Sequence, residues 1–258
     1  MNQKPKQIER DDATSIFDSD PILGNYISHH PSNRTRLMII AGVIYTIAVG
    51  IIQLVFWNVA DNIASIFIPI LFAGLAGVVL WYMLHHWNRE VVLYERGFSF
   101  RQGSSTAYIL YMNVVKLVPN IEKNSFLGFS WKVYDYKLVT DIDEILTINN
   151  VYSSIDKLTR VLESLVTRDR LPILRQKMQA GTAIPFNDSV SLSLEGITID
   201  DKVLFWQEFK GQSVKNAQII LQSSDNDTWA SIPVNELDNP MLLLVLLKER
   251  GRNPEIAQ

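Results

Sequence analysis

The chain has 258 residues, of which 47% are hydrophobic and 20% are charged, and its formal net charge at pH 7 is −3. This length fits one large domain or two small ones. The weakly acidic balance argues against a nucleic-acid partner, because nucleic-acid-binding domains are usually strongly basic. The sequence contains no cysteine, which excludes disulfides, thiolate metal sites and cysteine nucleophiles within it.

The N-terminal segment, residues 1–33, is predicted to be a mobile polar tail followed by a juxtamembrane stretch. It lacks the short apolar core and the small-residue cleavage site of a signal peptide. Scattered proline and serine residues accompany four aspartates in its first twenty positions, which are Asp11, Asp12, Asp18 and Asp20. Such a composition is typical of a chain that does not fold on its own.

Residues 34–89 contain two apolar segments, 37–57 and 63–84, without a single charged residue. Each has about twenty residues, which matches the thickness of a bilayer core at about 1.5 Å per residue. Buried helices of soluble proteins seldom stay apolar on every face over this length. The sequence therefore predicts two transmembrane helices that form an antiparallel hairpin, because only residues 58–62 connect them.

The orientation of this hairpin follows from its basic flanks. Arg34 and Arg36 precede the first segment and Arg89 follows the second, whereas the connection carries one acid and no base. Basic residues concentrate on the cytoplasmic side of membrane helices. We therefore expect an integral protein of the cytoplasmic membrane with both termini in the cytoplasm.

A repeated pattern follows the hairpin. Residues 93–100 (LYERGFSF) align with residues 192–199 (LSLEGITI), and each stretch alternates like a strand on both sides of a glycine. We expect Gly97 and Gly196 to supply a positive φ in tight turns. Further strands are predicted at 131–140, 144–148, 217–222 and 228–234, so that each copy is a β meander.

Each copy is predicted to end in a helix, which gives modules at residues 90–181 and 182–258. In the first, Ser153 or Ser154 is expected to cap a helix of 3.6-residue period that Pro172 kinks or restarts and that ends before Gly181. In the second, the signals for a helix over residues 241–250 are Asn239 as cap, Pro240 at the first helical position and Gly251 past the end.

The order of these features resembles an uncharacterised family of bacterial membrane-anchored proteins with PH-like domains. The resemblance covers nearly the whole chain and rests on residues 23–26 (LGNY), 94–98 (YERGF), Ala180-Gly181, Pro185-Phe186 and 194–197 (LEGI). It implies an α+β fold, in which a transmembrane helical hairpin precedes two PH-like modules, each an antiparallel meander or barrel closed by a C-terminal helix. The family brings no catalytic or ligand-binding residues to carry over.

The basic residues that remain are candidates for contact with anionic lipid. Residues 90–150 carry six Lys and Arg against seven Asp and Glu, and residues 190–251 carry five against nine, so neither module is basic. A solvated surface is the favoured interpretation of the arginines on the connecting helix, with lipid contact as the alternative. The candidates are Arg34, Arg36, Arg89, Arg168, Arg170 and Arg175.

No enzymatic motif is present, because the sequence has no nucleotide-binding loop, no GxSxG elbow and no HExxH helix. The pairs His29-His30 and His85-His86 bracket the hairpin, but adjacent helical histidines point about 100° apart, which disfavours a metal site. The acidic turns at residues 141–144 and 225–227 lack the ligand spacing of a calcium loop. We therefore expect neither catalysis nor a metal or other cofactor.

The second module is the expected site for a protein partner or for self-association. It contributes Trp206, Phe209 and Trp229, and aromatic residues are enriched where proteins bind one another. The sequence thus favours a membrane-anchored, non-catalytic interaction or scaffold protein. A peripheral sensor of anionic lipid and an accessory subunit of a larger membrane complex are the alternatives.

Overall fold

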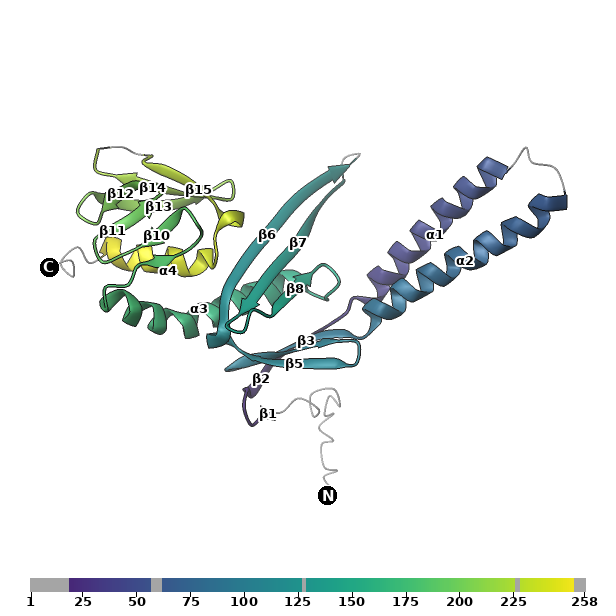
Figure 1. Ribbon diagram of the computed structural model, residues 1–258, viewed down its shortest axis with the longest axis horizontal. Helices are drawn as coiled ribbons and strands as arrows, with labels where there is room; N and C mark the ends of the chain where they lie inside the picture. The colour runs from purple at the N-terminus through teal and green to yellow at the C-terminus, as the bar shows by residue number, and fades with distance from the viewer. Residues whose placement is uncertain (1–18, 57–61, 127–128, 226–227, 253–258) are drawn as a thin grey trace, which may run out of the picture.

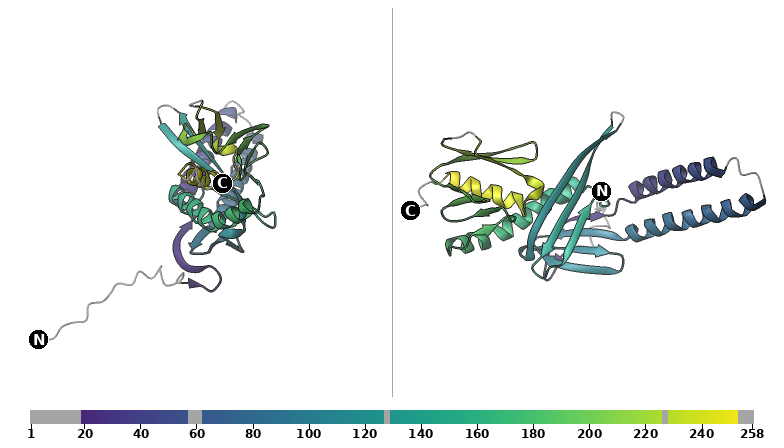
Figure 2. Two further views of the ribbon diagram at one scale, coloured as in Figure 1. Left: turned by 90° about the vertical axis from the view of Figure 1, so that its left-hand side faces the viewer. Right: turned by 45° about the horizontal axis from the view of Figure 1, so that its top comes forward.

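The computed structural model describes residues 19–56, 62–126, 129–225 and 228–252. These residues form a mixed α+β fold with four helices and several antiparallel sheets (Figure 1). A pair of long helices extends from one end, a first β unit lies in the middle, and a second β unit lies at the end far from the helix pair (Figures 1 and 2).

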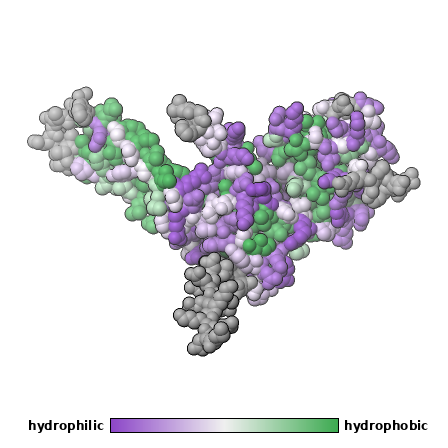
Figure 3. Space-filling view, turned by 180° about the vertical axis from the view of Figure 1, so that it is seen from behind, coloured by the Kyte–Doolittle hydropathy of each residue, from purple (hydrophilic) through white to green (hydrophobic). Residues whose placement is uncertain are grey.

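The helix pair consists of α1 (Arg34–Phe56) and α2 (Asn62–Trp87). The bounds of the predicted segments, 37–57 and 63–84, differ from the bounds of these helices by at most three residues. Both helices are long and apolar enough to cross a membrane, and protein buries only 6% and 0% of their most apolar windows. Their hydrophobic side chains are therefore exposed along most of the pair (Figure 3). The predicted connection, apart from Asn62, lies outside the described residues.

The first β unit contains two sheets. One has the strand order β1-β2-β3-β4-β5 and the other has the order β6-β7-β8. A short 3-10 helix, η1 (Tyr111–Asn113), joins them. The strands are β1 (Ser19–Asp20), β2 (Gly24–Pro31), β3 (Arg89–Tyr94), β4 (Gly97–Gln102), β5 (Ser105–Leu110), β6 (Val114–Phe126), β7 (Phe129–Thr140) and β8 (Ile145–Asn149).

Strand β2 corrects the prediction that residues 1–33 lie outside the folded unit. It pairs with β3 in antiparallel register, with Tyr26 opposite Tyr94 and Pro31 opposite Glu90. The inward side chains of β2 include Ser28 and His30, so the strand lacks the apolar alternation that would have revealed it. The helical hairpin is thus inserted between two neighbouring strands of one sheet.

The second β unit also contains two sheets, with the strand orders β12-β11-β10-β9 and β13-β14-β15. The short helix η2 (Val234–Glu236) precedes its final helix. The strands are β9 (Ile184–Pro185), β10 (Val190–Leu192), β11 (Gly196–Ile199), β12 (Lys202–Phe205), β13 (Phe209–Lys215), β14 (Gln218–Ser223) and β15 (Ala230–Pro233). The strands predicted at 131–140, 144–148, 217–222 and 228–234 correspond to β7, β8, β14 and β15.

The two glycines of the aligned stretches occupy equivalent places, but the predicted reason for them is wrong. Neither is among the described glycines with positive φ. Each instead faces a neighbouring strand so closely that an added Cβ would lie 2.3 Å from the Ile109 oxygen at Gly97 and 2.2 Å from the Leu204 oxygen at Gly196. Close backbone approach, not turn conformation, requires glycine here.

Two buried aromatic residues perform the same task in the two units. The Tyr111 hydroxyl donates to the Tyr94 carbonyl at 2.9 Å, and the Trp206 indole N–H donates to the Ser193 carbonyl at 3.2 Å. Tyr111 comes 17 positions after the residue whose carbonyl it bonds, and Trp206 comes 13 positions after its own. A large apolar ring with one polar group suits a core position next to an unpaired carbonyl.

Helix α3 (Ile155–Gln179) belongs to both β units. Its first half packs Leu158 and Leu162 into the first core, and its second half packs Leu174 and Met178 into the second. The predicted module boundary at residue 181 therefore needs correction, because one uninterrupted helix serves as the closing helix of one unit and as a wall of the next.

The predicted signals at the ends of α3 are partly correct. Ser154 is the first residue outside the helix, but its side chain makes no capping hydrogen bond and its φ is +50°. The helix continues through Pro172 without a break. At the other end Gly181, with φ +80°, follows the helix and the Thr182 N–H donates to the Lys177 carbonyl at 3.0 Å, which is the expected glycine termination.

The final helix, α4 (Pro240–Arg252), includes Gly251 instead of ending before it. An added Cβ at Gly251 would lie 3.4 Å from the Phe209 ring, an ordinary van der Waals distance, so packing does not require glycine there. Asn239 precedes the helix, but its amide donates to the Val115 carbonyl of β6 at 2.7 Å instead of capping α4. The predicted cap is thus a contact between the two β units.

Candidate functional site

Hydrogen bonds between distant segments connect the helical hairpin to the first β unit at their junction. The Ser32 N–H donates to the Arg89 carbonyl at 2.7 Å, and the Ser32 hydroxyl donates to the Trp87 carbonyl at 2.6 Å. The Asn33 N–H donates to the Val151 carbonyl at 2.6 Å. These bonds fix both ends of the hairpin to the sheets, so the feet of α1 and α2 lie at the same level.

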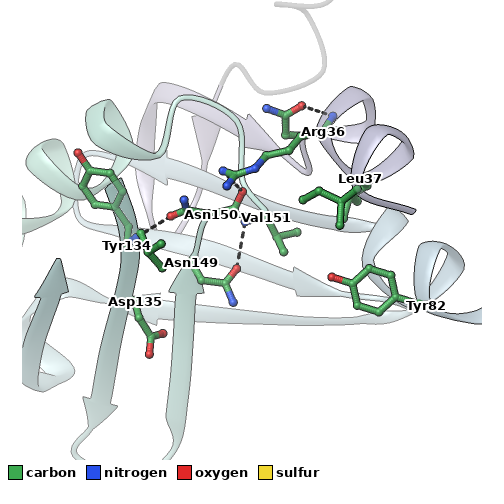
Figure 4. Close-up of a pocket in the computed structure, with 11 residues that line it drawn as sticks. Arg36, Leu37, Tyr82, Tyr134, Asp135, Asn149, Asn150 and Val151 are labelled. Atoms are coloured by element: carbon green, nitrogen blue, oxygen red, sulfur yellow. Dashed lines mark hydrogen bonds between the residues drawn. The ribbon is translucent and has the colours of Figure 1, made fainter. Parts of the chain in front are cut away.

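A cavity of about 380 Å³ opens beside these feet, between α1, α2 and the strands β7 and β8 (Figure 4). Leu37 and Tyr82 approach it from the helices, and Tyr134 and Asp135 come from β7. The full lining is Asn33, Arg36, Leu37, Ile40, Tyr82, Val133, Tyr134, Asp135, Asn149, Asn150 and Val151.

Asn150 organises the polar wall of this cavity. Its side-chain oxygen accepts from the Tyr134 N–H at 2.6 Å, and its amide donates to the Lys132 carbonyl at 2.9 Å. Its own carbonyl accepts from the Arg36 guanidinium at 3.2 Å. Arg36 is thereby held with its charge beside an apolar wall, an arrangement that suits an amphipathic molecule with an anionic end.

A buried polar group lies behind the junction, on β2. The His30 ring bonds the Ser28 hydroxyl at 3.0 Å and the Ser153 carbonyl at 3.1 Å, and its residue is only 2% exposed. Burial lowers the pKa of His30, and the nearby charge of Lys157 acts in the same direction. His30 is therefore expected to remain neutral at pH 7.

The histidine pairs do not meet in a metal site. His29 bonds the Glu90 carboxylate at 3.0 Å, and the rings of His85 and His86 contact each other edge to face at 5.1 Å. Within the part of the chain that the structure describes, no group of three or more His, Cys, Asp or Glu side chains is placed to hold a metal ion.

The arginines of α3 are engaged within the protein. Arg168 bonds Asp169 at 2.6 Å and Arg175 bonds Glu249 of α4 at 3.1 Å. Arg170 donates to the Met112 carbonyl at 3.3 Å, and burial lowers the pKa of its guanidinium. Arg168 also donates to the Glu95 carbonyl, so each of the three arginines contacts one of the β units that α3 joins. Their contact with anionic lipid stays a prediction, as it does for Arg34, Arg36 and Arg89 at the junction.

The predicted partner surface on the second unit is wrong for two of its three residues. Trp206 is 7% exposed and Phe209 is 8% exposed, and both belong to the second core. Trp229 packs against the same core as a partly buried residue. Their hydrophobic character is explained by burial.

Several residues of the junction were not foreseen as functional. Asn33, Tyr134 and Asn149 join the cavity only because β7, β8 and α1 meet in space. One local signal was available, since the dipeptide Asn149-Asn150 ends a predicted strand with two side chains that can bond neighbouring backbone groups. Nothing local connects that dipeptide with Arg36, which lies 114 positions earlier.

Comparison with known protein families gives one match. The model of a family of unknown function (DUF6585) matches residues 16–255, which is nearly the whole chain. A comparison with curated proteins finds no match.

Proposed function

The chain belongs to the DUF6585 family of unknown function, and we propose that it is a membrane-anchored, non-catalytic interaction protein that presents two PH-like modules to the cytoplasm. Its helical hairpin would lie in the bacterial cytoplasmic membrane, as the resemblance to membrane-anchored bacterial proteins implies. The partner would be another protein or a second copy of the chain.

The insertion of the hairpin into a sheet carries this proposal. Because β2 and β3 pair directly, the two apolar helices leave and re-enter the first β unit at adjacent points. An anchor attached by two strands holds the unit at a fixed distance and angle to the membrane, unlike a single flexible linker. Such an attachment suits a protein that presents a surface.

The arrangement of the sheets supports PH-like modules. Leaving aside the two-residue strand β1, each unit has a four-stranded antiparallel sheet, then a three-stranded antiparallel sheet, then a long helix. This order is the one that the resemblance to tandem PH-like domains implies. The continuous helix α3 would transmit the fixed orientation of the first module to the second.

The orientation rests on the junction arginines. Arg34, Arg36 and Arg89 all lie at the ends of α1 and α2 that adjoin the β unit. Basic residues favour the cytoplasmic side, so both modules would face the cytoplasm. Trp87, at the last position of α2, suits the interface between the bilayer and water.

An exposed apolar patch on the second module is the proposed partner surface. Leu194, Val203 and Phe205 are 42%, 41% and 44% exposed, and the last two lie on β12, the edge strand of its sheet. An edge strand offers unpaired backbone groups beside its side chains. The occupant we propose is an extended segment of a protein partner that pairs with β12.

The absence of native cysteine allows a clean test of topology. Single variants Asn58→Cys and Ser224→Cys would be exposed to a membrane-impermeant maleimide in intact cells. We expect labelling of Asn58→Cys from outside and labelling of Ser224→Cys only after lysis. The reverse pattern would contradict the orientation, and recovery of the protein in the soluble fraction would contradict the anchor itself.

Photocrosslinking tests the interaction role. A photoreactive amino acid at Phe205 is expected to give a discrete adduct in cells, whereas the same group at Tyr108, an exposed aromatic residue of the first module, serves as the matched control. Equal labelling at both positions, or at neither, would count against a partner on β12.

A further inference from the structure

A second, smaller cavity lies at the foot of the hairpin and is lined by three arginines. Its volume is about 70 Å³, and its lining comprises Pro31, Arg34, Trp87, Asn88, Arg89, Glu90 and Arg101. The arginines come from three segments, since Arg34 begins α1, Arg89 begins β3 and Arg101 lies near the end of β4. The pairing of β3 with β4 places Arg101 opposite Glu90.

The charges around this cavity do not balance. Glu90 is the one carboxylate in its lining, and it already bonds Arg101 at 3.2 Å and His29 at 3.0 Å. Arg34 and Arg89 form no salt bridge within the described residues. Successive side chains of a strand point to opposite faces, so Arg89 points away from the face of β3 that carries Glu90, and Arg101 shares the Glu90 face. The guanidinium groups of Arg34 and Arg101 against one carboxylate leave one positive charge in excess at this cavity.

The two arginines without a carboxylate are nevertheless held in place. The Arg34 guanidinium lies 5.0 Å from the centroid of the Trp87 ring, within the range of a cation–π contact. Arg89 bonds the His85 ring at 3.1 Å, and its buried Nε has no hydrogen-bond acceptor among the described residues. Arg34 forms no salt bridge within the described residues, so it is a positioned cation in the lining of this cavity that an anion can pair with.

The size and position of the cavity identify the anion. One water molecule needs about 10–15 Å³ on this measure, so the cavity can accept a group the size of phosphate but not an acyl chain. It lies where α1 begins and α2 ends, tied together by the bond from the Ser32 hydroxyl to the Trp87 carbonyl. Lipid phosphates lie at this level when the two helices span a bilayer.

We propose that Arg34 and Arg101 bind the phosphate of an anionic phospholipid while the acyl chains remain beside α1 and α2. This inference rests on the proposed membrane placement of the hairpin. Guanidinium groups match phosphate oxygens in pairs. The excess positive charge favours a lipid with a net negative headgroup over phosphatidylcholine, whose choline cation it repels.

The test uses the full chain, purified in mild detergent and titrated with phosphatidylglycerol or phosphatidylcholine, with bound lipid counted by native mass spectrometry. We expect tight phosphatidylglycerol adducts that weaken about tenfold or more in Arg34→Gln plus Arg101→Gln, since the variant removes the charge-assisted hydrogen bonds to the phosphate. Glu90→Gln is expected to change affinity in the opposite direction, because it removes the one carboxylate.

Arg160→Gln, at an exposed position of α3, is the matched control, and Arg36→Gln tests the larger cavity, which that arginine lines at the same end of α1. Phosphatidylglycerol binding that survives the double variant and disappears in Arg36→Gln would overturn the assignment. A second experiment adds inorganic phosphate alone and measures thermal stability. If it stabilises the wild-type protein against heat as well as phosphatidylglycerol does, and the double variant abolishes this, the site takes free phosphate and the lipid assignment is wrong.

The experiments distinguish a failure of this inference from a failure of the proposed function. A protein that fractionates with membranes but shows equal affinity for the two lipids would retain its anchor and lose this site. A protein that is recovered in the soluble fraction would lose both. Thermal unfolding of each variant guards against misfolding, and if the double variant unfolds, Arg34→Gln alone decides, because the Arg34 side chain is exposed.

Discussion

The two β units share the same order of sheets and closing helix. Leaving β1 aside, they differ in the connection between the first two strands of the four-stranded sheet, which are β2 and β3 in the first unit and β9 and β10 in the second. In both, the first strand ends in a proline, and the next residue donates its N–H to the facing strand. Ser32 donates to the Arg89 carbonyl at 2.7 Å, and Phe186 donates to the Val190 carbonyl at 2.8 Å. The first unit carries the helical hairpin, residues 32–88, between these points, whereas the second carries only residues 186–189.

This difference shows how a large insertion can leave a sheet intact. The ends of β2 and β3 are already adjacent because of their pairing, so whatever connects them does not disturb the ladder. The hairpin adds two apolar helices to one unit without changing the glycine, the aromatic residue or the closing helix that both units share. The second unit therefore shows the plan without an anchor.

The strongest test of the shared plan is Gly97→Ala beside Gly196→Ala. Each Cβ would lie within 2.3 Å of a carbonyl oxygen on the next strand, so the sheet has to open by more than an ångström. We expect each change to cost about 4 kcal/mol of unfolding free energy. Hydrogen exchange of the purified chain would show lost protection in the unit that carries the change.

Gly77→Ala is the control for this pair, because no atom lies within 4 Å of its added Cβ. It should leave exchange in both units unchanged. A large effect at Gly97 with none at Gly196 would break the equivalence of the two units.

Helix α3 offers a second test, which asks whether the units are independent. Leu162→Ala removes a fully buried side chain from the first core, and Leu174→Ala removes one that is 6% exposed from the second. Each is expected to cost about 3 kcal/mol. Because one continuous helix joins both cores, either change should also increase exchange in the other half of α3.

Arg160→Ala, at an exposed position of the same helix, should have an effect below about 0.5 kcal/mol. If Leu162→Ala leaves residues 170–179 fully protected, the two halves of α3 respond separately and the units are mechanically independent.

The direct contact between the units gives a smaller effect. Asn239, with φ +57°, donates its side-chain amide to the Val115 carbonyl at 2.7 Å. Asn239→Gly removes this bond and keeps the backbone conformation favourable, so the expected loss is about 1 kcal/mol. Spin labels at Ser104→Cys and Ser224→Cys should then report a broader distribution of distances between the units.

Asp238→Asn is expected to have a smaller effect than Asn239→Gly. It removes the partly exposed ion pair of Lys116 and Asp238, whose atoms lie 2.7 Å apart, and such a pair contributes about a few tenths of a kcal/mol to stability. A distance distribution that stays narrow in Asn239→Gly would show that the side-chain bond is not needed, and that α3 and the remaining contacts, such as the bond from the residue 239 N–H to the Leu117 carbonyl, fix the units relative to each other.

The sequence predicted those parts of the fold that depend on local pattern. The apolar helices follow from uninterrupted hydrophobic segments, and the equivalent strands follow from the alternation around Gly97 and Gly196. Strand β2 was missed because Ser28 and His30 are its buried residues. A hydrogen-bonded polar side chain in a core leaves no periodic hydrophobic signal.

The site was predictable only in part, for a physical reason. The basic flanks of the hairpin identified Arg34 and Arg89 from their positions alone. Arg101 joins the cavity that Arg34 lines through the register of β3 with β4, which places it opposite Glu90, and no local pattern reports this register. For Trp206 and Phe209 the sequence predicted a partner surface where the structure has core. The residue types that form interfaces also fill cores, and only tertiary packing distinguishes these two roles.

The smallest expected effect is a pH dependence that only the first unit shows, because all four histidines lie in or beside it. Burial lowers the pKa of His30 below its usual value, with Lys157 and His29 acting in the same direction and the bond to the Ser153 carbonyl opposing them. In the unfolded chain the ring titrates near pH 6.5. Below that pH the unfolded state binds the proton more readily, so folding stability falls as the pH decreases from about 6.5 towards the lowered pKa of the folded state.

Hydrogen exchange at pH 7 and pH 5.5, corrected for intrinsic rates, should therefore show weaker protection of β2 and β3 at the lower pH, with little change in β10 and β11. His30→Asn is expected to remove the difference, because its amide does not titrate in this range. A variant that keeps the full pH dependence would assign it to groups other than His30, and the contrast between the two units would then not depend on the buried histidine.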